Sequence, residues 1–345
     1  MSINARILEE AIAAEDARSP FSGVVFIREK GEVLMAQGYG LANQAEQLPN
    51  TVQTRFGMAS GAKTFTSVAI CQLVERGRAT FDTRLKDCVD VPLPQFDPDV
   101  TLHHLLTHSA GTPDYFDEAV MDDYEALWHD RPMYAFRTPK DFLPLFANGA
   151  MKFKPGTQWA YNNAGFILLG LAVEQLAGTP FPEYVEKHIF QACGMTSSGY
   201  FPLDRLPGNT AQGYLPSEDG GWQTNIYAIP IVGGPDGGAY TTVDDLARFW
   251  DELMGYKLLS QETVARMLTP YWRTRPDRET YYGYGLRMSQ EKGKPRVYYM
   301  VGEDPGVSFF SSFHPGGQIQ FSLMGNVVEP AEAMFDCIDP ILNEA

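Results

Sequence analysis

The chain has 345 residues, of which 44% are hydrophobic and 20% charged, and its formal net charge at pH 7 is −16. This length and composition suit a soluble globular protein with a substantial core, in one large domain or two smaller ones. The acidic balance and the lack of a basic run argue against nucleic acid and acidic membranes as partners, because both bind cationic surfaces.

The first 20 residues predict an amphipathic surface helix, since apolar residues recur at helical spacing with acids on the other side. They lack the continuous apolar core of a secretory signal, and no stretch approaches the roughly 20 apolar residues of a membrane span. We therefore expect a cytoplasmic protein without a membrane span. The four scattered cysteines indicate neither a disulfide framework nor a zinc site.

The next elements are a β-hairpin and a buried helix. Two β-rich runs over 21–43 meet at Lys30-Gly31, which predicts the hairpin turn. Residues 58–77 predict a helix that is apolar nearly all round. Residues 81–198 then carry helix and loop signals, including an apolar helix over 164–178 that ends at glycine.

The C-terminal part begins with a glycine-rich stretch, 233–255, that passes into a helix with Thr242 or Asp244 as its cap. From residue 281 onward β patterns return, interrupted by a His-Pro-Gly-Gly turn at 314–317. Residues 331–345 predict a closing helix.

Strands near both ends of the chain with helices between them predict an α+β fold rather than alternating βαβ units. We expect one antiparallel sheet built from both termini and flanked by helices. In this division, residues 1–80 and 200–345 form the sheet region, residues 81–199 form a mainly helical insert, and the active site lies at their junction.

One lysine in the buried helix lies in an unfavourable place. Lys63 is in the first turn, where the helix dipole is positive, and it shares the burial of an apolar helix. One interpretation is local: Ser60 is the N-cap and Lys63 extends to solvent. However, a capping box has Glu or Gln three residues after the cap, and here the charge is opposite.

A second informative stretch is Tyr161-Asn162-Asn163, just before the next apolar helix. The local interpretation is that Asn162 or Asn163 caps the helix and Tyr161 packs.

Other motifs are incomplete. His104 and His108 have the i, i+4 spacing of a zinc pair, but Leu105 replaces the glutamate of H-E-x-x-H and a third ligand is missing, so core or capping roles are favoured. The two G-x-G sequences lack the third glycine of a dinucleotide site, and no serine lies in G-x-S-x-G.

Together, Ser60-Gly-Ala-Lys63 and Tyr161-Asn-Asn163 resemble the first two motifs of the serine β-lactamase and penicillin-binding-protein superfamily. The resemblance is to the branch with class C β-lactamases, D-aminopeptidases and related esterases, and it covers roughly residues 21–328. It implies the β-lactamase/transpeptidase-like fold and a reaction without metal or cofactor.

The resemblance also implies the roles of the motif residues. Ser60 would be an acylating nucleophile, and its weakly nucleophilic hydroxyl needs a neighbouring base. Lys63 and Tyr161 would converge on it, Tyr161 as a partial or transient phenolate held by the Lys63 ammonium. Which of the two is the base stays open. Asn163 would orient a substrate carbonyl or the Lys63 ammonium, and the Ser60 backbone N–H would donate to the oxyanion.

The third family motif, Lys or His followed by Thr or Ser and then Gly, is altered to Met300-Val301-Gly302. Gly302 fits a close approach of substrate to the strand, and the Glu303 backbone N–H would be the second oxyanion donor. In β-lactam and D-Ala-D-Ala enzymes this motif helps to bind the substrate carboxylate and to relay protons, which Met300 and Val301 cannot do.

The acidic pair after that motif, Glu303-Asp304, would repel an anionic substrate, or it is a solvated turn before Pro305. We therefore expect a poor β-lactamase.

The function favoured by these residues is a serine acyl hydrolase, esterase-like, that acts on a small-molecule ester or amide through a Ser60 acyl-enzyme. The first alternative is a D-stereospecific aminopeptidase or amidase, in which Glu303 or Asp304 binds the substrate ammonium. Weak β-lactamase or DD-peptidase activity comes next. From a different class, a non-catalytic acyl-binding or sensor protein would retain the fold without turnover.

Overall fold

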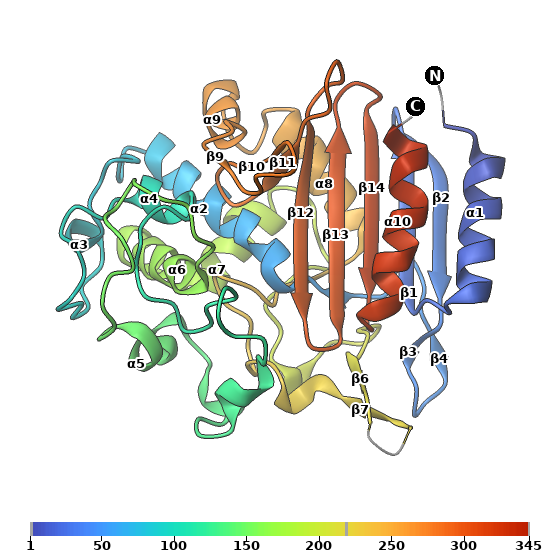
Figure 1. Ribbon diagram of the computed structural model, residues 1–345, viewed down its shortest axis with the longest axis horizontal. Coiled ribbons are helices and arrows are strands. Elements are labelled where there is room, and N and C mark those ends of the chain that lie inside the picture. The colour runs from blue at the N-terminus through green and yellow to red at the C-terminus, as the bar shows by residue number, and fades with distance from the viewer. Residues whose placement is uncertain (1–2, 218–219, 344–345) are drawn as a thin grey trace.

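The computed structural model describes residues 3–217 and 220–343. Within these residues the main element is an eight-stranded antiparallel sheet, in the order β2-β1-β14-β13-β12-β11-β10-β9 (Figure 1). Its strands are β1 Gly23–Glu29, β2 Glu32–Tyr39, β9 Trp272–Arg273, β10 Thr280–Tyr282, β11 Arg287–Ser289, β12 Val297–Asp304, β13 Val307–His314 and β14 Ile319–Gly325. The sheet is built from both ends of the chain, as the sequence predicted.

Three small two-stranded sheets lie outside the main sheet in the described part of the chain. They pair β3 Leu41–Asn43 with β4 Leu48–Pro49, β5 Phe56–Gly57 with β8 Tyr240–Thr241, and β6 Tyr214–Pro216 with β7 Trp222–Thr224. The pairing of β5 with β8 fixes the chain immediately before the buried helix to a segment nearly 200 residues later.

The predicted β-turns are confirmed. Lys30 and Gly31 join β1 to β2 with φ of 51° and 87°, the left-handed conformation of a tight hairpin turn. The His-Pro-Gly-Gly stretch joins β13 to β14, which pair from Ser308 opposite Gly325 to His314 opposite Ile319.

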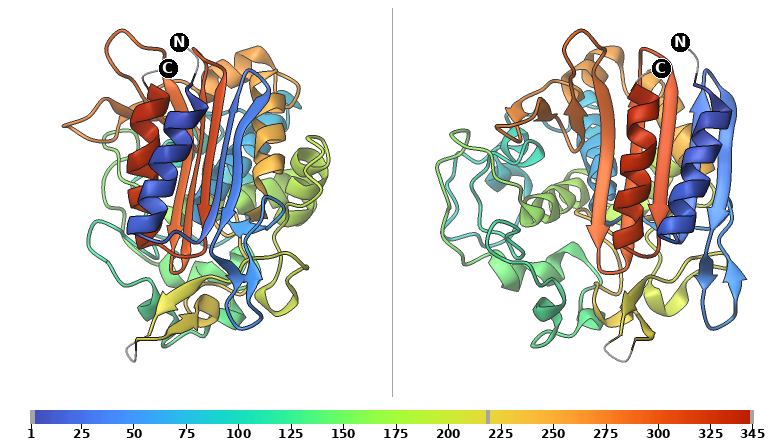
Figure 2. Two further views of the ribbon diagram at one scale, coloured as in Figure 1. Left: turned by 90° about the vertical axis from the view of Figure 1, so that its right-hand side faces the viewer. Right: turned by 45° about the vertical axis from the view of Figure 1, so that its right-hand side comes forward.

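Helices α1 (Ala5–Arg18) and α10 (Glu329–Asn343) lie side by side on one face of the sheet (Figure 2). Their buried side chains, such as Leu8 and Met334, pack on the outer face of β1 and β14. The expected terminal helices are thus present; positions 1–2 and 344–345 of those predictions lie outside the described residues.

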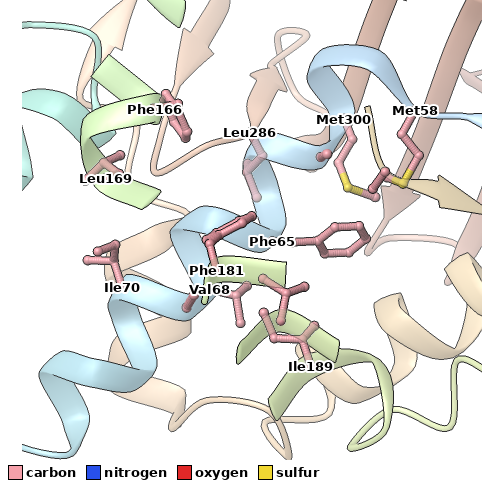
Figure 3. Close-up of a cluster of buried hydrophobic side chains, with 14 of the residues drawn as sticks. Met58, Phe65, Val68, Ile70, Phe166, Leu169, Phe181, Ile189, Leu286 and Met300 are labelled. Carbon is pink, nitrogen blue, oxygen red and sulfur yellow. The ribbon is translucent and has the colours of Figure 1, made fainter. Parts of the chain in front are cut away.

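The other face of the sheet packs against α2 (Lys63–Glu75) and α8 (Val243–Met254). These helices enclose the larger core together with helices that lie between them in the chain, and Figure 3 shows a cluster of its buried side chains. Phe65 of α2 makes edge-to-face contacts with Phe190 and Phe249, both ring pairs 5.0 Å apart. Helix α8 is capped by Thr242, one of the two predicted caps.

The remaining helices are α3 Leu85–Cys88, α4 Leu102–Leu106, α5 Leu143–Phe146, α6 Asn163–Ala177, α7 Phe181–Val185 and α9 Gln261–Met267. Helix α6 is the apolar helix predicted from the sequence; it ends at Gly178, whose φ of 70° is typical of a C-cap glycine. Among the described residues no single helix is long and apolar enough to cross a membrane; α6 and Phe181–Phe190, bent by 73°, pass that length and composition test only as a pair.

Candidate active site

Ser60 lies in a 3-10 turn, Ala59–Ala62, that leads into α2. Ala59 has a φ of 43°, which is costly for a residue with a Cβ. The turn is held from both sides: the Met58 N–H donates to the Ala239 carbonyl (2.8 Å), and the Gly238 N–H donates to the Ala59 carbonyl (3.1 Å). These hydrogen bonds keep the strained backbone in place, and Ser60 lines a cavity.

Lys63 is 1% exposed, and its ammonium makes three hydrogen bonds. It donates to Ser60 Oγ (2.9 Å), Asn163 Oδ1 (2.8 Å) and the backbone carbonyl of Asp236 (2.6 Å). The interpretation of Ser60 as an N-cap with Lys63 extending to solvent is therefore wrong. Neither the 3-10 turn nor α2 has a side-chain cap at its start, and Lys63 does not reach solvent. The cost of burying the ammonium is offset by acceptors that fix it against the serine hydroxyl.

Tyr161 completes the group around the serine. The Ser60 side chain is near enough to lower the pKa of the Tyr161 hydroxyl, and Lys63 Nζ lies 5.0 Å from the centroid of the Tyr161 ring. Burial, and after it the negative charge of Glu118, raise the pKa of Tyr161 despite the lowering effect of the Ser60 hydrogen bond and of Arg287. The resting side chain is therefore a neutral phenol.

The two asparagines at the start of α6 have different tasks. Asn162 is the N-cap, and its Oδ1 accepts from the Gly165 N–H (2.6 Å), so the local interpretation holds for this residue. Asn163 is the first helical residue; its backbone N–H donates to Asp114 (2.8 Å) and its Oδ1 accepts from Lys63. Asn163 thus makes the expected contact that orients the ammonium, and its expected contact with a substrate carbonyl stays a prediction.

His108 holds the segment that carries Tyr161, a role that the sequence analysis missed. Its Nδ1 accepts from the Asn162 N–H (3.1 Å) and its carbonyl accepts from the Ala160 N–H (3.0 Å), so both neighbours of Tyr161 bond to one residue. The His108 and Tyr161 rings lie 4.4 Å apart. His104, by contrast, is a capping residue of α4, as expected.

The altered third motif lies on β12, directly against the turn of Ser60. A Cβ added to Gly302 would lie 2.2 Å from the Met58 carbonyl oxygen and 2.7 Å from the Ser60 nitrogen, so this close approach requires glycine. Val301 is 38% exposed, whereas Met300 is 1% exposed and belongs to the buried cluster of Figure 3. Met300 thus serves mainly the core and borders only a small hollow beside Ser60.

Glu303 and Asp304 are the last two residues of β12, so the interpretation as a solvated turn is wrong; the turn consists of Pro305 and Gly306. Glu303 is exposed and Asp304 is partly buried. Burial raises the pKa of Asp304 to about 7. Both carboxyl groups border the cavity at the serine.

That cavity has a volume of about 810 Å³. The predicted site residues that line it are Ser60, Tyr161, Asn163, Val301, Gly302 and Glu303. Segments more than 200 residues apart in the chain therefore meet around one space that is large enough for a small molecule.

Arg287 on β11 is a second residue that the sequence analysis missed. It pairs with Tyr299 of β12, lines the cavity, and has its guanidinium 5.7 Å from the centroid of the Tyr161 ring. It forms no ion pair within the described residues. The site thus has a cation on the strand next to the altered motif, in addition to the acidic pair that was expected to repel an anion.

The arrangement of sheet, covering helices and a serine at the start of a buried helix is the β-lactamase/transpeptidase-like fold. Residues 8–344 match the model of the Beta-lactamase family, and the chain belongs to that family. The relatives of this family are serine hydrolases, among them esterases, amidases and peptidases.

Two curated relatives are a putative penicillin-binding protein PbpX of Bacillus subtilis (27% identical, covering 90% of this chain and 72% of that protein) and a D-aminopeptidase of Gluconobacter oxydans (28%, covering 85% and 53%). The chain thus spans from about half to under three quarters of the length of these two proteins. A solved structure, the penicillin binding protein from Bacillus halodurans, is similar with a TM-score of 0.91 at 46% identity, covering 96% of this chain and 99% of that one.

Proposed function

We propose that this chain is a serine acyl hydrolase, esterase-like in its chemistry, that acts through an acyl-enzyme on Ser60. The observation that carries the proposal is the buried Lys63 ammonium, held 2.9 Å from the Ser60 hydroxyl by two further acceptors. A nucleophile within hydrogen-bond reach of a base that a third group orients is the arrangement of covalent catalysis.

In the first half of the reaction, the acceptor must be deprotonated, as the neutral Lys63 amine or as a Tyr161 phenolate whose proton has passed to Lys63. Ser60 Oγ attacks the ester carbonyl while its proton passes to that group, and the pair then gives one proton to the leaving alcohol as the C–O bond breaks. In the second half, water attacks the acyl-enzyme and the same groups return the proton to Ser60. The backbone N–H groups of Ser60 and Glu303 are the proposed oxyanion donors, and the contact of Gly302 with the Ser60 nitrogen supports this.

A burst experiment tests the proposal. With a short-chain p-nitrophenyl ester, we expect a burst of p-nitrophenolate of one equivalent per chain or less, followed by steady turnover. A burst without turnover would support the non-catalytic acyl-binding alternative. Neither a burst nor turnover with esters would contradict the proposal, and hydrolysis of a D-amino acid amide would then favour the amidase.

The amidase or D-aminopeptidase alternative is supported by the acidic side chains of the cavity, which suit a substrate ammonium. A weak β-lactamase remains a lesser candidate, because Met300 and Val301 supply neither the charge nor the hydroxyl of the usual third motif.

His108 is proposed as a positioning residue for Tyr161. His108→Phe retains a ring but loses the acceptor at Nδ1, so we expect kcat for the ester to fall about 10²-fold while KM changes little. His108→Asn is the matched variant, since asparagine keeps an acceptor and tolerates positive φ, and it should recover part of kcat. Equal kcat for the Phe variant and the parent would contradict this role.

A further inference from the structure

The cavity at Ser60 is negatively charged along one wall. Glu118, Asp122, Asp123 and Glu125 all line it from one loop. The charge of Glu118 reaches into the site, because it raises the pKa values of both Tyr161 and Asp304.

Three more carboxyl groups line the cavity from other parts of the chain: Asp236, Glu303 and Asp304. Asp236 accepts a hydrogen bond from the Tyr115 hydroxyl. Asp304 is different, because its partly buried carboxyl group has no hydrogen-bond donor and no ion-pair partner within the described residues. A partly buried carboxyl group that the protein leaves unpaired is costly, and a bound cation would offset that cost.

The positive charges near the serine do not neutralise this wall. The Lys63 ammonium is already engaged by Ser60, Asn163 and the Asp236 carbonyl. Among the described residues that line the cavity, Arg287 is the one with a basic side chain. It also borders the small hollow beside Ser60, and no acidic residue lines that hollow. Arg287 and the carboxyl groups form no ion pair, so the two charges remain separate.

Aromatic side chains line the cavity together with the carboxyl groups. Tyr115, Phe116, Tyr124, Phe142 and Tyr240 line the same cavity. Faces of aromatic rings attract organic cations and pack against their hydrocarbon parts. No cluster of three or more metal-ligating side chains occurs in the described part of the chain, which favours an organic cation over a metal ion.

We propose that this cavity binds an ammonium group on an apolar body, so that the preferred substrates are esters or amides that carry an organic cation, with Asp304 as the main specificity residue. This rests on the proposed function of Ser60. The unpaired carboxyl group, the separate loop of acids and the aromatic lining all favour this substrate class.

Matched ester pairs test the inference. One pair places the charge in the acyl group: p-nitrophenyl esters whose chain ends in trimethylammonium or in its neutral isostere, tert-butyl. The other pair places it in the alcohol: a choline ester against the dimethylbutyl ester. We expect kcat/KM to favour the cation about tenfold or more in at least one pair. A ratio near one in both pairs would overturn the inference, while turnover of the neutral esters would leave the proposed function intact.

In Asp304→Asn, we expect the ratio of kcat/KM for the cationic ester to kcat/KM for its neutral partner to fall close to one. The ratio is taken within each variant, so a change in overall activity cancels. Asp90→Asn, an exposed carboxyl group away from the cavity, removes the same charge and should keep the ratio of the parent. An unchanged ratio in Asp304→Asn would contradict the assignment of this residue.

The pH dependence has a definite sign. Because burial raises the pKa of Asp304 to about 7, the carboxyl group is largely protonated at about pH 6 and largely ionised at about pH 8. The cation preference should therefore rise over this interval in the parent and stay flat in Asp304→Asn. In the free enzyme, the charges of Asp236, Glu118 and Glu303 also raise the pKa of Asp304. The charge of Lys63 lowers it.

Calorimetry with benzyltrimethylammonium tests the cation site without catalysis. We expect this unreactive probe to bind the parent at least about tenfold more tightly than Asp304→Asn at about pH 8. Equal binding to both, or no binding to the parent, would overturn the inference. If no ester is turned over but the probe binds as expected, the proposed function fails and the cation site stands.

Discussion

Ser60→Ala loses ester turnover almost completely: the expected fall in kcat is on the order of 10⁴- to 10⁶-fold on a short-chain p-nitrophenyl ester. The reason is that the variant cannot form the acyl-enzyme, although Lys63, Tyr161 and the cavity stay in place. The measurement is the initial rate of p-nitrophenolate release by the parent and the variant.

Ser67→Ala is the matched control for that experiment. Ser67 is buried in α2, one turn after Lys63, and does not line the cavity at Ser60. It should retain the rate of the parent. If Ser60→Ala kept the parental rate, the hydrolysis would come from another nucleophile or from an added hydrolase, and the assignment of Ser60 would be wrong.

Lys63→Met is expected to lower kcat by about 10³-fold or more, because Ser60 loses the amine that lies against its hydroxyl and that either accepts its proton or stabilises a Tyr161 phenolate. Methionine is unbranched and fills much of the same volume, so the variant should still fold. The substitution leaves Asn163 Oδ1 and the Asp236 carbonyl without the Lys63 donor. Each unpaired buried acceptor lowers the free energy of unfolding by roughly 1–3 kcal/mol.

The effect on chemistry can be separated from the effect on stability. Single-turnover acylation, followed below the melting temperature of the variant, should show the full loss. Lys86→Met, on the exposed side of α3, is the control and should keep both rate and stability. Acylation of Lys63→Met at the parental rate would show that Tyr161 alone activates the serine.

Local chemistry allowed much of the fold to be predicted. The Lys30-Gly31 turn, the αL glycine that ends α6 and the Thr242 cap of α8 are each decided by residues within a few positions of one another. The joining of both chain ends in one sheet followed from the order of strand and helix patterns.

The site was predictable where its residues share a motif. Ser60 and Lys63 are three residues apart, and the lysine was conspicuous because a cation at a buried helix start has no structural benefit. Asn163 was predicted to orient either Lys63 or substrate, and its contact is with Lys63.

Other site residues depend on long-range pairing that no local pattern encodes. Arg287 reaches the cavity because β11 pairs with β12 in the register that sets it opposite Tyr299. His108 contacts the segment of Tyr161 from more than 50 residues away. Met300 occupies the first position of the altered third motif, but the alternation along β12 directs it into the core and its neighbour Val301 toward the cavity.

The central claim is that an acyl group is carried by Ser60. The most direct test is to quench the parent during steady turnover of a slowly hydrolysed ester, measure the intact mass, and map the modified peptide. The account predicts one acyl group per chain on the peptide that contains Ser60, and its disappearance once the ester is exhausted. Turnover without any adduct, or an acyl group on a different residue, would contradict it.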